Sequence, residues 1–326
     1  MDDLFPRPPL LPWLPGETLF SLVSRHDYFR GNPAPKFTSE QFFGHPLGGA
    51  QHDFPTYLGE FASRTDGLYG DAQQIALEHT LMAFYGAFIS NTEARRLAHQ
   101  MSGRSVALLK SGLGLQQNGF RAHHPLKACR LCMEEDREAF GWSYWHLEHQ
   151  YPGACVCLKH AQLLQAADMK VNGVHPYLWC LPSEMNWDEM SPQTSHSQEV
   201  FDAARSLTQT ARDLHAQCSA HKDLVSRLHE HYMVEVVQRD WVTATGNLRM
   251  PKLAASFLEH IRPLRAIPGL QALPKDWQEA ESQLSNVLRP RLNRMHPLRH
   301  IVVCDWLYGS ATPLAQRLVM NQSGLG

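Results

Sequence analysis

Two short pairs of residues in the middle of the sequence have the spacing of metal ligands. Cys129 and Cys132 enclose two residues, Cys157 and His160 enclose another two, and 24 residues separate the pairs. A two-residue gap lets both side chains of a tight turn reach one ion, so the pairs predict a tetrahedral Cys3His site for Zn2+. Four protein ligands leave no open coordination position. The predicted zinc is therefore structural and could not activate water.

The other thiols and histidines leave several alternative ligands and one alternative interpretation. His146 and His149 lie close to the two pairs and could compete for the metal, although nothing in their spacing improves on the four ligands chosen. Cys155 lies two residues before Cys157 and could replace it, although we prefer Cys157. Because free cysteine is among the most buried residue types, the alternative to a metal site is a group of unligated thiols. We expect ordinary thiols at the isolated cysteines Cys180, Cys218 and Cys304. We assign no catalytic role to the isolated histidines, which include His123, His124, His146 and His149.

The segment around these pairs is too small to build a sufficient core alone, so zinc would stabilise it. Structural zinc contributes on the order of 10 kcal/mol in isolated fingers. We place a zinc-finger domain at residues 121–180, after an N-terminal helical domain at 1–120 and before a polar linker at 181–198. Residues 199–326 would form a C-terminal helical domain. The predicted fold is mainly α and multidomain, with a helix-turn-helix unit on each side of the zinc finger.

The N-terminal domain is expected to begin with two short helices. An apolar stripe over residues 17–29 predicts the first, which Gly31 ends. Thr38 and Gln41 have capping-box spacing and predict the start of the second. The preceding Pro-rich residues 9–15 suit an extended strap that docks on a partner or on the chain's own body.

Further helices follow along the chain. Residues 71–88 are apolar enough for one buried helix, and Ser90 has the spacing to cap the next, which ends near Met101. Pro251 fits the first turn of a later helix, after a connection at 241–249, so helix, turn, helix is predicted there too. The helices expected in the C-terminal domain cover residues 199–218, 223–239, 252–261, 275–288 and 298–308.

The composition limits the function classes. The chain has 326 residues, 19% of them charged, and a net charge of -2, so any nucleic-acid contact must come from local patches. The N-terminus lacks a signal-peptide pattern, and no stretch has the length and apolarity of a membrane span. We expect a cytoplasmic protein with no membrane contact. We find no Walker loop, no acidic two-metal cluster and no nucleophile motif, so an enzyme is not predicted.

Two basic regions are the candidate DNA contacts. Residues 289–300 contain four arginines and two histidines and no carboxylate, which suits phosphate contacts or, equally, a solvated surface. The arginines are Arg289, Arg291, Arg294 and Arg299. The helix after Pro251 could place Arg249, Lys252 and Ser256 in a major groove, although a plain helical hairpin is the commoner object.

Several segments resemble the TniQ/TnsD family of transposon target selectors. They are PRPPLLPWLPGETLFSLVSR, CRLC, YWHLEH and CLKHAQLL, in this order, and QQIALEHTLMAFYGAF resembles the TnsD branch in particular. The resemblance runs from about Phe5 to Leu164 and, more weakly, to Tyr308. It implies zinc on the same four ligands. The proline common after the first cysteine of each pair is Arg130 or Leu158 here, which leaves the ligands intact.

The resemblance implies a bacterial, nucleoid-associated target-site selector that binds double-stranded DNA and recruits a TnsC-like AAA+ regulator, which loads the transposase. An alternative from a different class is an adaptor that docks on a CRISPR effector complex and reads no bases itself. A third is an unrelated zinc-ribbon transcription regulator without a transposon partner. Because we find no catalytic motif, all three hypotheses describe proteins that break no bonds.

Overall fold

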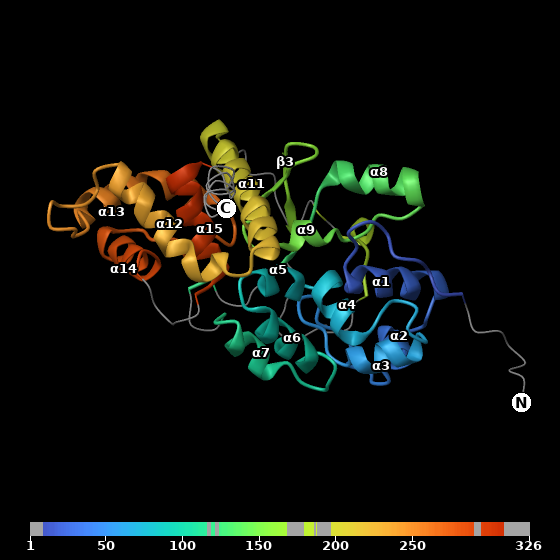
Figure 1. The fold of residues 1–326 in the computed structure, drawn as a ribbon. Helices are drawn as coiled ribbons and strands as arrows, with labels where there is room; N and C mark the ends of the chain where they lie inside the picture. Colours follow the sequence, from blue (N-terminus) through green and yellow to red (C-terminus); the bar gives the residue numbers. More distant parts are fainter. Residues whose placement is uncertain are drawn as a thin grey trace, which may run out of the picture.

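The computed structural model of the chain is mainly helical, with two short two-stranded sheets near the middle of the sequence (Figure 1). The structure describes residues 9–115, 119–120, 124–167, 179–185, 187, 197–289 and 295–309. The mainly α prediction is confirmed at this level. Within these ranges no helix is both long and apolar enough to cross a membrane.

The first part of the chain folds into short helices, and its first helix has the predicted ends. The helices are α1 (Leu19–Arg30), α2 (Pro35–Phe43), α3 (Leu58–Arg64), α4 (Ala72–His79), α5 (Met82–Ala87), α6 (Asn91–Gln100) and α7 (Ala107–Gly112). Thr18 Oγ1 accepts the Ser21 N–H at 3.1 Å and caps α1. Gly31 ends the helix with φ 59°, a left-handed conformation that glycine adopts without strain. The predicted stop at this glycine is therefore confirmed.

Two predictions for this part are wrong. Thr38 does not cap a helix, because α2 already begins at Pro35 and the Thr38 hydroxyl instead bonds Asn32 and Asp27. The predicted single helix over 71–88 is two helices, α4 and α5. Thr80 Oγ1 donates to the Ala76 carbonyl at 2.6 Å and accepts the Met82 N–H at 3.1 Å. Such local side-chain bonds compete with the helical ladder and break it here.

The Pro-rich strap lies on the chain's own body, one of its two predicted positions. The Tyr69 hydroxyl donates to the Leu11 carbonyl at 2.6 Å, and Trp13 stacks on His79 with ring centroids 3.6 Å apart. Beneath the strap, Arg25 forms a fully buried two-point ion pair with Glu17, at 2.8 and 2.6 Å. A paired guanidinium and carboxylate can be buried at tolerable cost, and removal of either partner would leave an isolated charge.

The middle of the chain holds the two small sheets and two helices. Strand β1 (Leu126–Ala128) pairs antiparallel with β4 (Gln165–Ala167), and β2 (Val156–Cys157) pairs antiparallel with β3 (Gln162–Leu163). The helices between β1 and β2 are α8 (Arg130–Phe140) and α9 (Leu147–Gln150). The two pairings bring residues near 128 and near 157 into one unit.

The last part of the chain is a group of longer helices. They are α11 (Gln198–Ala220), α12 (Leu224–Gln238), α13 (Met250–Ile261), α14 (Trp277–Val287) and α15 (Pro297–Tyr308), with short 3-10 turns η1 (Pro182–Glu184) and η2 (Pro263–Ala266). Between α12 and α13 the chain forms a turn closed by a bridge from Val242 to Leu248. Helix α13 packs chiefly against α14 and also against α15. The predicted helix, turn, helix order is present, but α13 is held by helices that follow it.

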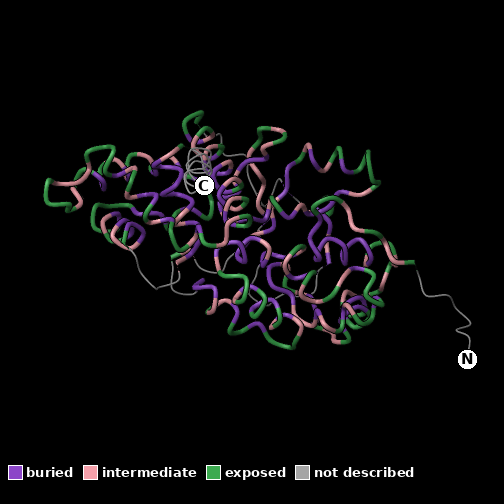
Figure 2. The backbone as a smooth tube through the Cα atoms, viewed as in Figure 1, coloured by how far each residue is buried: buried purple, intermediate pink, exposed green. Residues whose placement is uncertain are grey.

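The described helices share one hydrophobic core. Buried apolar side chains form a continuous cluster from Leu19 in α1 to Leu307 in α15, and Figure 2 shows buried backbone in both halves of the molecule. Within the predicted linker, Pro182 starts η1 and Trp187 is buried, whereas 188–196 lie outside the described residues. The domain boundaries stay a prediction.

A chain of buried polar groups also links distant segments. Asp53 Oδ2 accepts a bond from Lys110 Nζ at 2.9 Å and lies 3.2 Å from His124 Nδ1. His124 Nε2 lies 2.7 Å from the Tyr85 hydroxyl, which is 3.2 Å from His296 Nε2. His296 precedes α15 and caps it through the Leu298 N–H. This chain ties the N-terminal helices to the last described helix.

Candidate metal centre

The four predicted ligands are brought together by two small structural elements. Cys129 follows strand β1 and sits at the N-cap of α8, so that Cys132 lies in the first turn of that helix. Cys157 ends β2, and His160 lies in the turn that leads to β3. Ala161, next in this turn, has φ 50°, which lets the chain reverse within a few residues. A helix start and a tight hairpin thus face each other.

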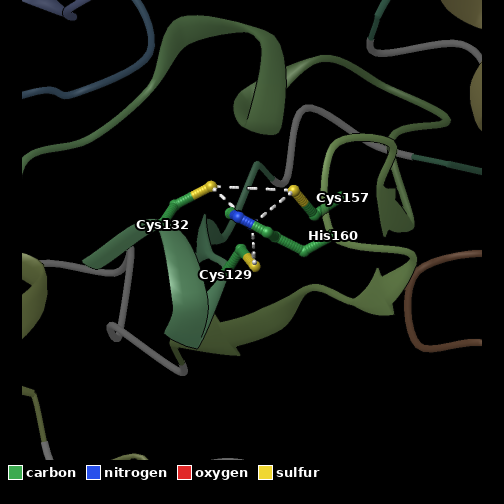
Figure 3. A group of neighbouring side chains, drawn as sticks. All are labelled: Cys129, Cys132, Cys157 and His160. Atoms are coloured by element: carbon green, nitrogen blue, oxygen red, sulfur yellow. Dashed lines mark hydrogen bonds between the residues drawn. The ribbon is translucent and has the colours of Figure 1, made fainter. Parts of the chain in front are cut away.

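The ligand atoms have the separations of a tetrahedral site (Figure 3). His160 Nδ1 lies 3.4 Å from the Cys129 sulfur, 3.3 Å from that of Cys132 and 3.6 Å from that of Cys157, and the last two sulfurs are 3.6 Å apart. All four atoms lie within 4.8 Å of one another. Zinc bonds of about 2.3 Å to sulfur and about 2.0 Å to nitrogen imply tetrahedral edges of roughly 3.5–3.8 Å. The four side chains could therefore bind one metal ion.

The protonation chemistry of the thiols also fits a cation. Hydrogen bonds from Cys129 and Cys132 hold the pKa of Cys157 well below the usual range for a thiol. Its hydrogen bonds with Cys129 and Cys157, together with burial, raise the pKa of Cys132 far above that range. One thiolate is therefore favoured, whereas several adjacent thiolates need a positive charge among them. A divalent cation bound by the sulfurs supplies that charge and deprotonates coordinating thiols.

A carboxylate supports the histidine ligand from outside. With Nδ1 directed at the sulfurs, the other ring nitrogen of His160, Nε2, lies 3.0 Å from Glu135 Oε1. Glu135 also pairs with Lys159. A carboxylate behind a ligating imidazole fixes the ring orientation and raises its basicity. The sequence analysis missed Glu135, although its position three residues after Cys132 in a predicted zinc knuckle was a usable signal.

The nearby alternatives to these ligands lie outside the cluster. The Cys155 backbone N–H donates to Thr208 on α11, and its thiol is not among the four grouped side chains. His146 Nε2 lies 2.7 Å from a carboxylate oxygen of Asp136. His149 is half-buried close to Cys157, and loss of contact with water lowers its pKa. The geometry therefore favours Cys157 over Cys155 as the ligand.

The first group of DNA candidates is partly engaged within the fold. Arg249 donates to the Val242 carbonyl at 2.9 Å, and its guanidinium lies 3.6 Å from Asp240. Ser256 accepts the indole N–H of Trp306 at 3.1 Å. Lys252 is exposed on the first turn of α13. Of the three, Lys252 has the position that a phosphate contact needs.

The arginine-rich region is described only in part. Arg289 is exposed after α14, whereas Arg291 and Arg294 lie outside the described residues. Arg299 on α15 is half-buried, its Nε has no hydrogen-bond partner, and burial lowers its pKa. Arg299 is thus directed inward, whereas a phosphate contact requires a guanidinium on the surface. The DNA role of these four residues stays a prediction.

A closed Cys3His set within a helical chain is typical of a structural metal site and not of a metalloenzyme. Comparisons of this chain with known protein families indicate which family it resembles. Residues 8–164 match the TniQ family model, and residues 207–326 match the model described as TnsD, Tn7-like transposition protein D. The chain is also 25% identical over 170 residues to the transposon Tn7 transposition protein TnsD of Escherichia coli. That match covers 51% of this chain and 32% of the E. coli protein.

The chain therefore belongs to the TniQ/TnsD family, as the sequence resemblance indicated. The two family segments follow each other and together cover most of the chain. TniQ/TnsD proteins are targeting adaptors and not catalytic enzymes, which confirms the prediction that the chain is not an enzyme. All four candidate metal ligands lie inside the TniQ segment.

Proposed function

We propose that the chain selects the target site for a multi-protein DNA transposon. It binds double-stranded target DNA and recruits an AAA+ regulator of the TnsC type, which delivers the transposase. The observation that carries this proposal is the succession of a TniQ segment at 8–164 and a TnsD segment at 207–326 in one chain. The E. coli relative is named a transposition protein, although the match spans a third of its length.

The proposal gives the metal a structural role. Zn2+ held by Cys129, Cys132, Cys157 and His160 would clamp the start of α8 to the β2–β3 turn. The small sheets here have only two or three residues in each strand, so they bury too little to hold this unit alone. Val156, next to a ligand, is in the core that also includes α11. A rigid metal unit would therefore keep the TniQ segment fixed on the TnsD segment.

A transposition assay in cells tests the proposed function. A strain that carries the marked transposon but lacks this gene receives the wild-type gene or a variant, and insertion sites are mapped by sequencing. We expect insertions at a preferred site with the wild-type gene and their loss without it. The variant Cys155→Ser should behave as wild type, whereas Cys157→Ser should behave as the deletion.

The same assay separates the alternatives. Insertions that follow the sequence of a supplied guide RNA would favour docking on a CRISPR effector complex over direct recognition of DNA. An insertion pattern that does not depend on the gene would refute a role in target selection. A change in gene expression with unchanged insertions would favour a transcription regulator.

A further inference from the structure

A basic segment in the TniQ part has no carboxylate over 40 residues. Between Ala94 and Met133 the sequence contains seven lysines and arginines and no aspartate or glutamate, whereas the whole chain has 32 carboxylates among 326 residues. The segment includes α6 from Ala94 onward, α7, β1 and the start of α8. The composition of the whole chain hides this asymmetry, because acidic residues elsewhere balance the net charge.

Three of these cations have partners within the chain. Lys110 bonds the buried Asp53, and Lys127 is buried and donates to the carbonyls of residues 151 and 154. Arg96 forms a two-point ion pair with Glu93, at 2.8 and 2.7 Å. These three side chains are explained by local structure. The cations that remain on the surface must be explained in another way.

Of the other four cations, Arg121 lies outside the described residues and Arg130 has an interaction at the start of α8, which leaves Arg95 and Arg104. Both are exposed, and within the described ranges neither has an ion pair. His99 is exposed one turn after Arg95 on the same face of α6. Uncompensated positive charge on neighbouring surface elements attracts polyanions and loses that attraction as salt rises.

These residues lie on a helix-turn-helix that the sequence analysis placed elsewhere. Helix α6 is followed by a turn at residues 101–106 and then by α7, and the two helices pack on each other. The backbone of residues 57–59 holds the turn, because Tyr57 N–H donates to the Gly103 carbonyl at 2.8 Å and Leu58 N–H to the Met101 carbonyl at 3.0 Å. Arg104 thus projects from a fixed turn and not from a loose loop.

The outer side of α7 is small and apolar where it meets solvent. Leu108 is 74% exposed, the largest value among the exposed large hydrophobic residues of the described chain, and Ser105 and Ala107 beside it are also exposed. Small side chains let a helix approach a groove closely, and an apolar side chain can contact a thymine methyl group.

Several carboxylates on the neighbouring helices have contacts within the fold, and Glu78 on α4 accepts a hydrogen bond from the Gln74 side chain at 3.3 Å. Glu93 pairs with Arg96, and Glu60 on α3 lies 3.3 Å from Arg64. Asp71 accepts two backbone N–H groups at the start of α4. Within the part of the chain that the structure describes, neither Arg95 nor Arg104 forms an ion pair with one of these carboxylates.

We infer that the outer surface of α6, the 101–106 turn and α7 binds the backbone of double-stranded DNA. Arg95 and Arg104 contact phosphates, and Leu108 enters the groove between them. The identity of the ligand rests on the proposed function, whereas the position of the surface rests on the charges and exposures above. This surface is separate from the C-terminal candidates, of which Ser256 and Arg299 are engaged or directed inward.

The test measures the salt dependence of DNA binding by the full chain. The probe is a fluorescent 30-base-pair duplex of mixed sequence, titrated from 50 to 200 mM salt. For Arg95→Ala with Arg104→Ala we expect the slope of log K against log salt to fall by about two, since each phosphate contact contributes roughly one. Affinity at 100 mM salt should fall by about tenfold or more. The matched control is Arg212→Ala with Arg227→Ala, two exposed arginines near carboxylates, and should keep the wild-type slope.

A second measurement does not depend on losing affinity. With p-benzoylphenylalanine in place of Leu108, irradiation should crosslink the protein to the duplex, whereas the same group in place of Val234, exposed on α12, should not. An unchanged slope in the double variant together with no crosslink at 108 would overturn the proposed surface and leave target selection standing. Failure of the wild-type chain to bind any duplex at 50 mM salt would overturn both the surface and direct DNA recognition.

Discussion

Two cysteines at and just before strand β2 allow the metal centre to be tested with a matched pair of variants. Cys157 and Cys155 are two residues apart, but the Cys157 sulfur lies 3.6 Å from His160 Nδ1 while Cys155 lies outside the cluster. Cys157→Ser should therefore remove zinc, and Cys155→Ser should retain it. Both changes replace one sulfur atom by oxygen, so any difference reports the position of the thiol.

The size of the effect follows from the structure. Structural zinc sites contribute about 10–16 kcal/mol in finger peptides, whereas a whole domain is stable by about 5–15 kcal/mol. The β1–β4 and β2–β3 pairings are too short to replace the metal. We expect residues 125–165 to lose fixed structure in Cys157→Ser, while α11 to α15 stay largely helical because they pack on one another.

The assay combines metal analysis with hydrogen exchange. Zinc is measured in the purified proteins by mass spectrometry, and exchange is followed by peptide across the chain. Wild type and Cys155→Ser should hold one zinc ion per chain and protect residues 125–165, and Cys157→Ser should do neither. Wild-type protein that is free of metal yet fully protected in this region would refute the reasoning. Zinc lost from Cys155→Ser but kept by Cys157→Ser would show that the wrong thiol was chosen.

Three further predictions concern stability, pH and DNA. Glu17→Gln leaves the buried Arg25 guanidinium without its counter-charge and should lower the free energy of unfolding by about 3–5 kcal/mol in urea titration; a loss below 1 kcal/mol would contradict the buried pair. Burial alone would raise the pKa of Asp53, but the hydrogen bond with His124 and the charges of His52 and Lys110 lower it well below its usual value. Its stabilisation should thus be present above the unfolded pKa of about 4 and fade as pH falls below it, and Asp53→Asn should flatten this part of the stability profile. Replacing Arg289, Arg291 and Arg294 with alanine should weaken DNA binding at moderate salt. An unchanged slope of affinity against salt would exclude this region from the DNA interface.

Local sequence signals predicted the helices whose ends depend on neighbouring residues. Ser90 caps α6 by accepting the Glu93 N–H, and Gly31 ends α1 in a left-handed conformation, as predicted. Where two local sequence signals competed, the prediction was wrong. The apolar residues 71–88 suggested one helix. Only the structure shows that the Thr80 hydroxyl donates to the Ala76 carbonyl and accepts the Met82 N–H at the point where the helix divides.

For the candidate metal site too, part of the arrangement followed from the sequence and part only from the structure. Spacing identified the two ligand pairs, because a knuckle brings its own two side chains together within a few residues. Spacing alone left both Cys155 and Cys157 open, since both lie within five residues before His160. The choice depends on the pairing of β2 with β3, which directs Cys157 toward α8. Glu135 became visible only when α8 had been placed beside His160.

The sequence by itself determined the ligand pairs, most helix positions and the family, because these depend on residue types at short separations along the chain. Only the tertiary structure decided which surface cations are balanced. Lys110 looks like Arg95 and Arg104 in the sequence, yet Lys110 bonds the distant Asp53, whereas within the described ranges Arg95 and Arg104 have no ion pair. The physical reason is that the partner of a charge is chosen by distance in space, which packing between distant segments sets.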